Sequence, residues 1–218
     1  MDSRRERLRR ARLYFVTDVR PGLEALLAAA LAGGVDMVQL RDKSASDDEL
    51  VRAAAVFRRL CDEHGALFWL NDRPDLVAAC GADGVHVGQD DMAATEARKI
   101  AGSTDVLVGL STHSPAQLDA ALESGDADQL SVGPVWETPT KEGRPAAGLD
   151  YVRYAASVAG GCPWFAIGGI DLGNVREVIA AGASRVVVVR AIRDADDPGA
   201  AAAALREALE EASVGAES

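Results

Sequence analysis

The chain has 218 residues, of which 48% are hydrophobic and 26% are charged, and its formal net charge is -11 at pH 7. This length suits one large domain with a sizeable core, and the acidic balance excludes general nucleic-acid binding, which requires a basic face. The composition still admits an anionic substrate, because a local cluster of Arg and Lys can dominate one cleft.

Short apolar runs alternate with helical segments along the whole chain. Eight of these runs predict strands, at residues 13–17, 36–41, 67–71, 83–88, 105–111, 128–133, 164–169 and 185–190. Most are continuously apolar, which is typical of parallel strands buried on both faces. Between them lie helical patterns such as residues 22–32 and 46–63, the second of which begins with a serine and an acidic first turn.

Several units end in the same way, with a helix, a glycine and then the next strand, as in AGGVD, CGADG, SGDAD and AGASR. Repeated parallel units imply right-handed crossovers, and eight of them favour an α/β fold of the TIM (β/α)8 barrel type. An open doubly wound sheet is the structural alternative. We expect a single barrel domain over residues 1–218, with a short N-terminal helical extension at about residues 1–12 and a frayed C-terminal tail after Glu211.

The end of the second predicted strand carries three polar side chains with the same spacing. In such barrels, function collects on the loops that follow the strands. Alternation places Gln39, Arg41 and Lys43 on one side, where they form a site for an anion and a polar ring. The alternative is a solvated turn with an ion pair between Arg41 and Asp42, but a glutamine inside a strand favours function.

Acidic residues follow the third and fourth predicted strands. Asn71 and Asp72 end the third, and Asp91 follows the fourth. Carboxylates from neighbouring strand ends can converge on one ion, and two of them with phosphate oxygens and waters form a normal Mg²⁺ site. For either aspartate alone a helix N-cap is the favoured interpretation, since each precedes a helical pattern. Together, and facing a basic cluster, they favour a metal site.

The fifth predicted strand ends near hydroxyl groups and a histidine. Ser111 is a candidate phosphate contact, and Ser114 before a proline is typical of an N-cap. His113 has the chemistry of a general base, but a histidine in a turn is more often part of the hydrogen-bonded structure. We expect His86 to be packed in the core or behind the site, and His64 to lie on the surface.

A second anion region is expected on the opposite strands. The loop over residues 133–149 carries Thr138, Thr140 and Lys141, and its length suggests an active-site loop. Gly169 follows the seventh strand, and the eighth strand ends in Val189 and Arg190. Loops after these two strands commonly hold phosphate in this fold, and Lys141 could serve the first anion region instead.

Seven stretches of the chain form a recognisable series: QLRDK, the pair Asn71–Asp72, DGVHVGQDD, GLSTHS, SVGPVWETPTKEGRPAAGL, AIGGI and VVVVRAI. In order and position they resemble the thiamine phosphate synthase family, from about Tyr14 to Ile192. The resemblance implies a transferase that joins a pyrimidine methyl diphosphate to a thiazole phosphate. Diphosphate leaves to give a pyrimidine-stabilised carbocation, and the thiazole nitrogen then attacks it.

The resemblance also implies roles for the matching positions. Asp72 and Asp91 would bind Mg²⁺ as the cofactor, and Gln39 would hydrogen-bond the pyrimidine. The diphosphate would be held by Arg41, Lys43, Asn71, Ser111 and Lys141. The thiazole phosphate would be held by Thr138, Thr140 and the backbone at Gly169, with Val189 and Arg190 beside it.

Two positions depart from the family pattern. Arg190 stands where the family usually has serine, so that its guanidinium either adds a bond to phosphate or crowds the pocket. Glu137 stands where the family often has proline, and we expect its side chain to point to solvent.

The enzyme alternatives are a thiazole tautomerase, a sugar-phosphate epimerase and a Schiff-base aldolase using Lys43 or Lys141. A non-catalytic binder of thiamine precursors is the alternative from another class.

The three cysteines, Cys61, Cys80 and Cys162, are odd in number and lack paired spacing. This usage indicates buried thiols in a reducing compartment. The basic N-terminus lacks the apolar stretch of a secretory signal, and no apolar run approaches the about 20 residues of a membrane span. We therefore expect a cytoplasmic enzyme with small-molecule substrates and no membrane or nucleic-acid partner. The chain is also a candidate for assembly into a homo-oligomer.

Overall fold

The computed structural model describes residues 3–138 and 145–215, with side chains described as far as Glu211. Eight parallel strands pair in sequence order, and β1 pairs with β8 to close the barrel. The strands are β1 Leu13–Thr17, β2 Met37–Leu40, β3 Leu67–Asn71, β4 Gly84–Val87, β5 Leu107–Thr112, β6 Gln129–Val132, β7 Trp164–Ile167 and β8 Val186–Val188. The TIM-barrel prediction is confirmed, and the open doubly wound sheet is wrong because its edges would not pair.

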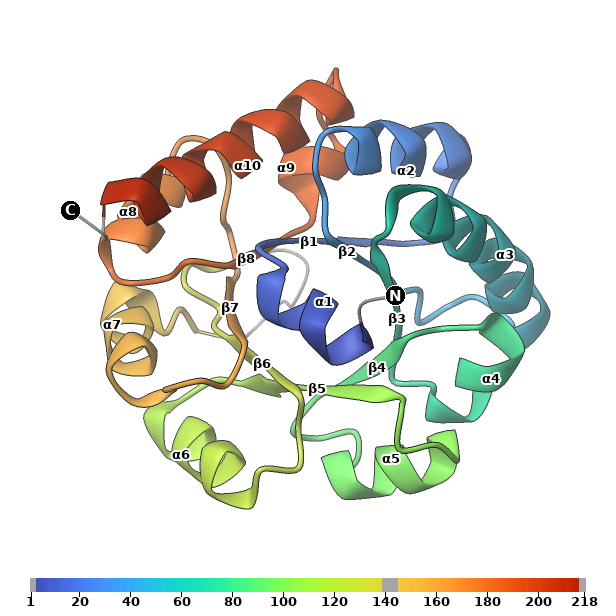
Figure 1. The fold of residues 1–218 in the computed structure, drawn as a ribbon, viewed down its shortest axis with the longest axis horizontal. Coiled ribbons are helices and arrows are strands. Elements are labelled where there is room, and N and C mark those ends of the chain that lie inside the picture. The colour runs from blue at the N-terminus through green and yellow to red at the C-terminus, as the bar shows by residue number, and fades with distance from the viewer. Residues whose placement is uncertain (1–2, 139–144, 216–218) are drawn as a thin grey trace.

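Helices form an outer ring around the strands, except for the first helix, which precedes β1 and lies over one end of the barrel (Figure 1). They are α1 Arg4–Arg10, α2 Leu23–Ala32, α3 Asp47–His64, the 3-10 helix η1 Pro74–Leu76, α4 Val77–Cys80, α5 Ala94–Ala101, α6 Pro115–Ser124, α7 Gly148–Val158, α8 Val175–Ala180, α9 Arg190–Arg193 and α10 Pro198–Gly215. The eighth strand ends two residues earlier than expected, so that Arg190 begins α9 and is not a strand residue. Within the described residues, no helix has both the length and the apolar character needed to cross a bilayer.

Side chains fill the barrel interior and separate its two ends. Tyr14, Trp69 and Phe165 pack there as one cluster with residues of α1, which lies across the N-terminal end of the barrel (Figure 1). Glycine in β4 makes room for the indole, since a Cβ on Gly84 would come 2.8 Å from Trp69 Cε3. The filled floor leaves the opposite end, where the strands terminate, as the open end of the barrel.

The recurring aspartates that precede the second, fourth and sixth strands have one shared role. Oδ2 of Asp36, Asp83 and Asp128 accepts a backbone N–H from the preceding strand, at 3.0, 2.9 and 2.9 Å respectively. Each carboxylate also receives an arginine from an outer helix, respectively from Arg206, Arg58 and Arg98. In the fourth repeat, AGASR, Arg185 takes the place of the aspartate before the eighth strand, and its Nε donates to the Ala11 carbonyl oxygen. The repeated phrase therefore marks clamps at the N-terminal end of the barrel.

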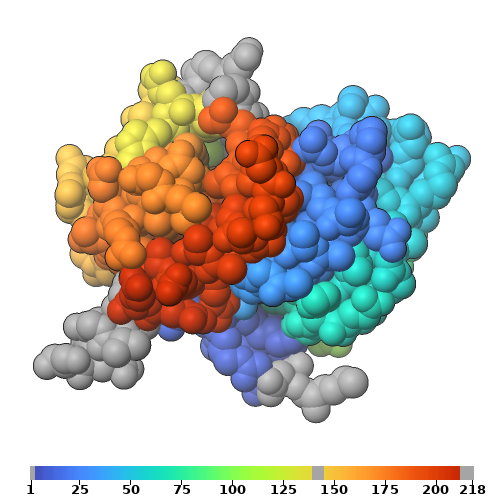
Figure 2. All heavy atoms as spheres, turned by 90° about the horizontal axis from the view of Figure 1, so that it is seen from above, coloured from blue at the N-terminus to red at the C-terminus, as the bar shows by residue number. Residues whose placement is uncertain are grey.

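The first and last parts of the chain meet on one flank of the molecule. Figure 2 shows α10 lying alongside α2, and the two helices are in extensive contact. Their alanine-rich surfaces permit this close approach, and Leu27 and Leu205 are fully buried near it. This packing covers the outside of the β8–β1 pairing and stabilises the closure of the barrel.

Candidate functional site

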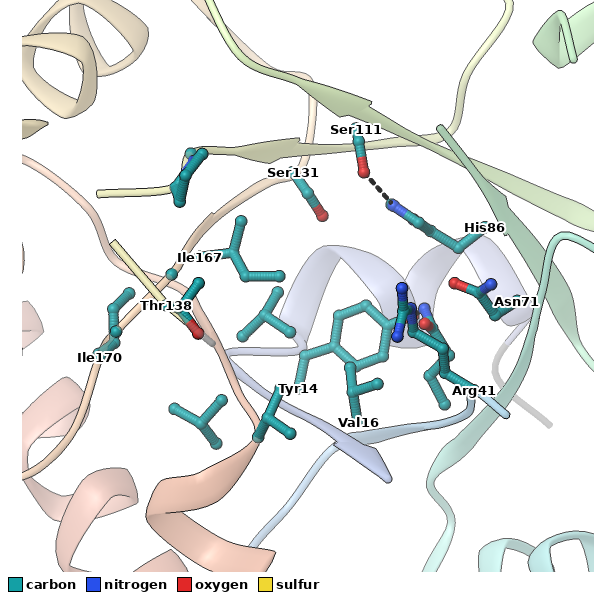
Figure 3. Close-up of a pocket in the computed structure, with 18 of the residues that line it drawn as sticks. Tyr14, Val16, Arg41, Asn71, His86, Ser111, Ser131, Thr138, Ile167 and Ile170 are labelled. Atoms are coloured by element: carbon teal, nitrogen blue, oxygen red, sulfur yellow. Dashed lines mark hydrogen bonds between the residues drawn. The ribbon is translucent and has the colours of Figure 1, made fainter. Parts of the chain in front are cut away.

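One pocket of about 310 Å³ lies at the C-terminal ends of the strands, within the size range of small-molecule sites. All eight strands contribute to its lining, and the loops after β2–β8 complete it. Figure 3 shows Arg41 and Asn71 on one side, Thr138 and Ile170 on the other, and Tyr14 between them. The pocket therefore has a polar end on β2–β4 and a second end on β6–β8.

Lys43 and two aspartates from neighbouring loops meet at the first end. The Lys43 ammonium Nζ lies 3.2 Å from Asp72 Oδ2 and 3.8 Å from Asp91 Oδ1. Burial raises the pKa of the Asp72 carboxyl, and the nearby charge of Asp91 raises it further, while Lys43 acts in the opposite direction. The two carboxylates are thus close enough to repel each other, and a cation between them relieves the repulsion.

Local backbone geometry aims both carboxylates at this point. Asp72 has φ 58°, a left-handed conformation that aspartate tolerates better than most side chains, and Asn71 Nδ2 donates to its Oδ2 at 2.6 Å. Asp91 closes a turn in which its Oδ2 accepts the Gly88 N–H at 3.0 Å. Neither aspartate caps the following helix, because the N-caps of η1 and α5 are Arg73 and Ala93. The helix-cap alternative is therefore wrong for both residues.

The donor set of this end fits Mg²⁺ shared with a substrate. Among the residues that the structure describes, no group of three or more His, Cys, Asp or Glu side chains is arranged to hold a metal ion. Asp72 and Asp91 nevertheless hold the Lys43 ammonium between them, so their carboxylates already bind a cation. One or two carboxylates are the usual protein ligands of Mg²⁺ where substrate phosphates and waters supply the others. A buried structural metal site of the zinc type is not present in these residues.

Gln39 and Tyr14 form the polar part of the pocket floor. Gln39 Nε2 donates to the Tyr14 hydroxyl, and both side chains are almost fully buried. Burial raises the pKa of Tyr14 well above its ordinary value, so that the phenol stays protonated. Gln39 keeps its carbonyl oxygen and a second N–H for a ring with both donors and acceptors.

A chain of buried polar groups crosses β4, β5 and β6 beneath the pocket. His86 Nε2 lies 2.9 Å from Ser111 Oγ, as Figure 3 shows, and His86 Nδ1 lies 3.3 Å from Gln129 Oε1. Gln129 Nε2 donates in turn to Ser131 Oγ at 3.0 Å. Each member restrains the next, which holds Ser111 at a fixed position in the pocket wall. His86 is buried, as expected from the sequence, but it also forms part of the pocket lining.

The second end is shaped by close contact between the end of β7 and the loop after β6. Val135 N donates to Ile167 O at 2.8 Å, and Trp136 N donates to Gly168 O at 3.1 Å. Gly168 has φ 107°, and a Cβ there would lie 2.5 Å from Pro134. Only glycine permits this approach, which brings Thr138 to the pocket beside Gly169.

The structure brings together all of the predicted site residues that it describes. Those that line the pocket are Gln39, Arg41, Lys43, Asn71, Asp72, Asp91, Ser111, Thr138, Gly169, Val189 and Arg190. Thr140 and Lys141 lie outside the described residues. Glu137 is exposed, as expected, and Ser114 caps α6 through Gln117 N. His113 also lines the pocket, with Nδ1 2.6 Å from the Gly133 carbonyl oxygen.

Sequence reasoning missed the apolar and small polar part of the lining. These residues include Tyr14, Val16, Ser131, Pro134, Ile167 and Ile170. Alternation along β1 could have identified Tyr14 and Val16 as inward-facing, since they lie two residues apart. Nothing in an apolar run distinguishes an inward residue that touches a ligand from one that only fills the barrel.

Comparison with known proteins identifies close relatives. A family model described as "Thiamine monophosphate synthase" matches residues 13–192. The thiamine-phosphate synthase of Thermus thermophilus is 57% identical over 203 residues, covering 91% of this chain and 97% of that protein. The thiamine-phosphate synthase of Acidothermus cellulolyticus is 55% identical over 196 residues, covering 88% and 92%. The structure of a thiamine phosphate pyrophosphorylase from Pyrococcus furiosus has a TM-score of 0.85 and 33% identity, covering 94% of this chain and 98% of that one.

Proposed function

This chain belongs to the thiamine monophosphate synthase family and makes thiamine phosphate, and from that premise we propose how its pocket does so. The substrates are a pyrimidine methyl diphosphate and a thiazole phosphate, and the reaction is a Mg²⁺-dependent transfer of the pyrimidine methyl group. The observation that carries the proposal is that the carboxylates of Asp72 and Asp91 converge on the Lys43 ammonium at one end of a pocket with two polar ends.

Asp72 and Asp91 are the residues that would hold Mg²⁺ against the diphosphate. When bound, the ion would act as a Lewis acid that neutralises charge on the departing diphosphate. Asn71 supports this arrangement by donating to Asp72 Oδ2. Gly88 supports it by donating to Asp91 Oδ2, which leaves Oδ1 directed toward Lys43.

Positive and hydroxyl groups next to the carboxylates would bind the diphosphate itself. Arg41 and Lys43 follow β2, and Ser111 lies on β5 with its hydroxyl fixed by His86. Lys141, which lies outside the described residues, is assigned to the same group on sequence grounds. Preorganised donors stabilise the charge that develops as the carbon–oxygen bond breaks, and they do so without reorganisation at the moment of reaction.

The remaining pocket walls would orient the two rings. Gln39, fixed by Tyr14, offers hydrogen bonds to the pyrimidine. Thr138, the Gly169 backbone and Arg190 lie at the opposite end and would bind the thiazole phosphate, with Val189 against the ring. Anchoring the two substrates at opposite ends brings the thiazole nitrogen to the pyrimidine methyl carbon and replaces a bimolecular encounter with an internal one.

No side chain needs to act as nucleophile in this scheme. The thiazole nitrogen supplies the electron pair, and the diphosphate leaves with the pair of the broken bond. His113 is engaged with the Gly133 carbonyl oxygen and His86 with Ser111, which suits positioning more than proton transfer. A tautomerase would not need the paired carboxylates or the diphosphate lysines. An epimerase would need facing acid and base carboxylates without a diphosphate clamp. An aldolase would need a lysine shielded from water, whereas Lys43 is exposed.

We place the enzyme in the cytoplasm, again as a proposal. Cys61, Cys80 and Cys162 are all free thiols, a usage that suits a reducing compartment. The burial of Cys61 raises its pKa to about 12, which makes it unreactive. Assembly into a homo-oligomer stays a prediction.

The test of the proposed function is a product assay with a matched pair of variants. The wild-type chain, incubated with both substrates and Mg²⁺, should yield thiamine phosphate by mass, and chelation of the metal should stop the reaction. Asp91→Ala should remove turnover without unfolding the protein, while Asp90→Ala in the same turn should retain it. Near-normal turnover of Asp91→Ala at saturating Mg²⁺ would show that the metal assignment is wrong.

A further inference from the structure

Arg73 connects two loops of the pocket without lining it. Its guanidinium forms two bonds to Asp47, Nη1 to Oδ1 at 2.5 Å and Nη2 to Oδ2 at 3.0 Å. It forms two more to Asp75, Nε to Oδ1 at 3.0 Å and Nη2 to Oδ2 at 2.7 Å. A planar guanidinium held by two carboxylates in this way has a fixed orientation.

The partners of Arg73 lie in two helices, each of which follows a different loop of the pocket. Asp75 lies in η1, two residues along the same loop. Asp47 is the first residue of α3, and the loop before it carries Lys43. That loop is a series of turns in which Asp42 Oδ1 accepts the backbone N–H groups of Ser44 and Ala45. Holding Asp47 therefore restrains the position of Lys43.

Arg73 also follows Asp72 directly in the chain. Asp72 is the one described non-glycine residue with positive φ. A left-handed conformation costs an L-residue roughly 1–2 kcal/mol, and it persists only where the surroundings hold the chain. The Asp72 N–H donates to the His86 carbonyl oxygen at 2.9 Å, which fixes the loop on the β4 side. Arg73 fixes the chain immediately after it, on the side of α3.

We propose that Arg73 is a positioning residue for the reaction, which ties the loop of Asp72 to the loop of Lys43 and so sets the geometry of the Mg²⁺–diphosphate end. The inference rests on the proposed function, because it assigns Arg73 a role through Asp72 and Lys43. The 3.2 Å separation between those two side chains is the geometry that Arg73 maintains.

The exposure of the network argues against a mainly stabilising role. The side chains of Asp47 and Asp75 are 63% and 50% exposed, and exposed ion pairs contribute little to folding stability. Placement is a more sensitive property, since removing a residue that orients a metal ligand typically weakens metal affinity or activity by about 10–100-fold. A loss of function that exceeds the loss of stability is therefore the signature of this role.

Arg59, which lies in α3 as Asp47 does, provides a matched control for Arg73. It also joins two carboxylates, Glu24 and Glu63, and it too is partly exposed. Its bonds connect α3 to α2 and to itself, and Arg59 does not belong to the pocket lining that the described residues form. Arg59→Ala therefore removes a comparable ion-pair network that has no connection to Lys43 or Asp72.

The experiment compares Arg73→Ala, Arg73→Lys, Asp47→Ala and Arg59→Ala. Calorimetry with Mg²⁺ and inorganic diphosphate measures binding without turnover, and steady-state kinetics separates kcat from the KM for thiazole phosphate. For Arg73→Ala and Asp47→Ala we expect Mg²⁺–diphosphate affinity and kcat to fall by about tenfold or more. The KM for thiazole phosphate should be unchanged, Arg73→Lys should recover only part of the loss, and Arg59→Ala should match the wild type.

Several outcomes would overturn the inference. Wild-type diphosphate affinity in Arg73→Ala would do so, as would equal losses in Arg73→Ala and Arg59→Ala. If Arg73→Ala does not fold, Asp47→Ala removes the cross-loop bonds from the other side, and wild-type binding in that variant overturns the inference equally. Failure of the wild-type chain to bind Mg²⁺–diphosphate would instead refute the proposed site, and the role of Arg73 with it.

Discussion

The ammonium of Lys43 lies 3.2 Å from the carboxylate of Asp72, and the same ammonium is 3.8 Å from Asp91. A lysine from the β2–α3 loop thus stands between carboxylates from the next two loops of the barrel. In the proposed mechanism, the Lys43 ammonium occupies the position that Mg²⁺ would take, and diphosphate would draw the ammonium away from it. Binding of the cation and of diphosphate should therefore be mutually dependent.

The Lys43→Met variant tests this dependence. Without the competing ammonium, Mg²⁺ alone should bind more tightly than to the wild type. Diphosphate together with Mg²⁺ should bind about tenfold more weakly or worse, because a charge-assisted hydrogen bond contributes about 1.5–3 kcal/mol. Calorimetric titrations with Mg²⁺, with and without diphosphate, measure both quantities. Lys99→Met in α5 is the control, and parallel weakening of both titrations in Lys43→Met would contradict the account.

Asp72→Asn should separate stability from activity. The folded pKa of Asp72 is raised, first by burial and then by Asp91, so that the ionised carboxylate destabilises the fold at neutral pH. Asparagine removes that charge and also tolerates the left-handed backbone at φ 58°. We expect unchanged or higher thermal stability and loss of Mg²⁺-dependent turnover. A clearly lower melting temperature would show that the pair with Lys43 stabilises the fold overall.

Much of the fold follows from the sequence, because its signals are local. Continuous apolar runs gave eight strands in the observed order, and the alternation of Gln39, Arg41 and Lys43 placed all three in the pocket. The convergence of Asp72 and Asp91 could be expected because neighbouring strand ends are adjacent in any closed parallel barrel. The end of β8 could not, since the apolar run extends one residue beyond the strand, through Val189, to the first residue of α9.

Acid should destabilise the protein partly through Asp83, whose side chain is only 3% exposed. Burial would raise the pKa of Asp83, but the bonds from Arg58, the Phe68 N–H and Arg4 outweigh it and hold the pKa below its usual range. The stabilisation is thus fully present above the unfolded-state pKa of about 3.9 and is lost as the pH falls through the lower folded pKa. Asp83→Asn should cost about 2–4 kcal/mol at pH 7.

Urea unfolding at pH 7 and near pH 3 tests this prediction. The free energy of unfolding of Asp83→Asn should fall less with acid than that of the wild type, because the titrating group is gone. Asp105→Asn, an exposed aspartate close to the same end of the barrel, serves as the control. Equal acid sensitivity of wild type and Asp83→Asn would place the titration elsewhere.

Arg190→Ser should weaken the phosphate end alone. Arg190 is exposed at the pocket edge, so that its removal should change stability by no more than about 0.5 kcal/mol. Loss of one charged hydrogen bond should raise the KM for thiazole phosphate by about tenfold and leave the KM for the pyrimidine diphosphate unchanged. Arg193→Ser, in the same short helix, is the control for charge. A higher kcat/KM in Arg190→Ser would mean that the guanidinium crowds the pocket.

Side-chain relationships across the barrel were beyond the reach of sequence reasoning. The line from Ser111 through His86 and Gln129 to Ser131 depends on the register of three strands, which no local pattern fixes. The bonds of Arg73 to Asp47 likewise join segments that are separate in the sequence. The left-handed backbone at Asp72 is not marked by a glycine, so no local pattern predicts it. Residue types indicated which groups take part, whereas their distances arise only from the closed fold.

In the proposed mechanism, Asp72 and Asp91 share one divalent cation with the diphosphate. A crystal structure of the protein with Mn²⁺ in place of Mg²⁺ and with inorganic diphosphate locates that ion by its anomalous scattering. We expect one ion within about 2.2 Å of an oxygen from each aspartate and of a diphosphate oxygen, with Lys43 moved from Asp72 to the diphosphate. An ion bound by one aspartate or neither, with Lys43 still paired to Asp72, would contradict this mechanism.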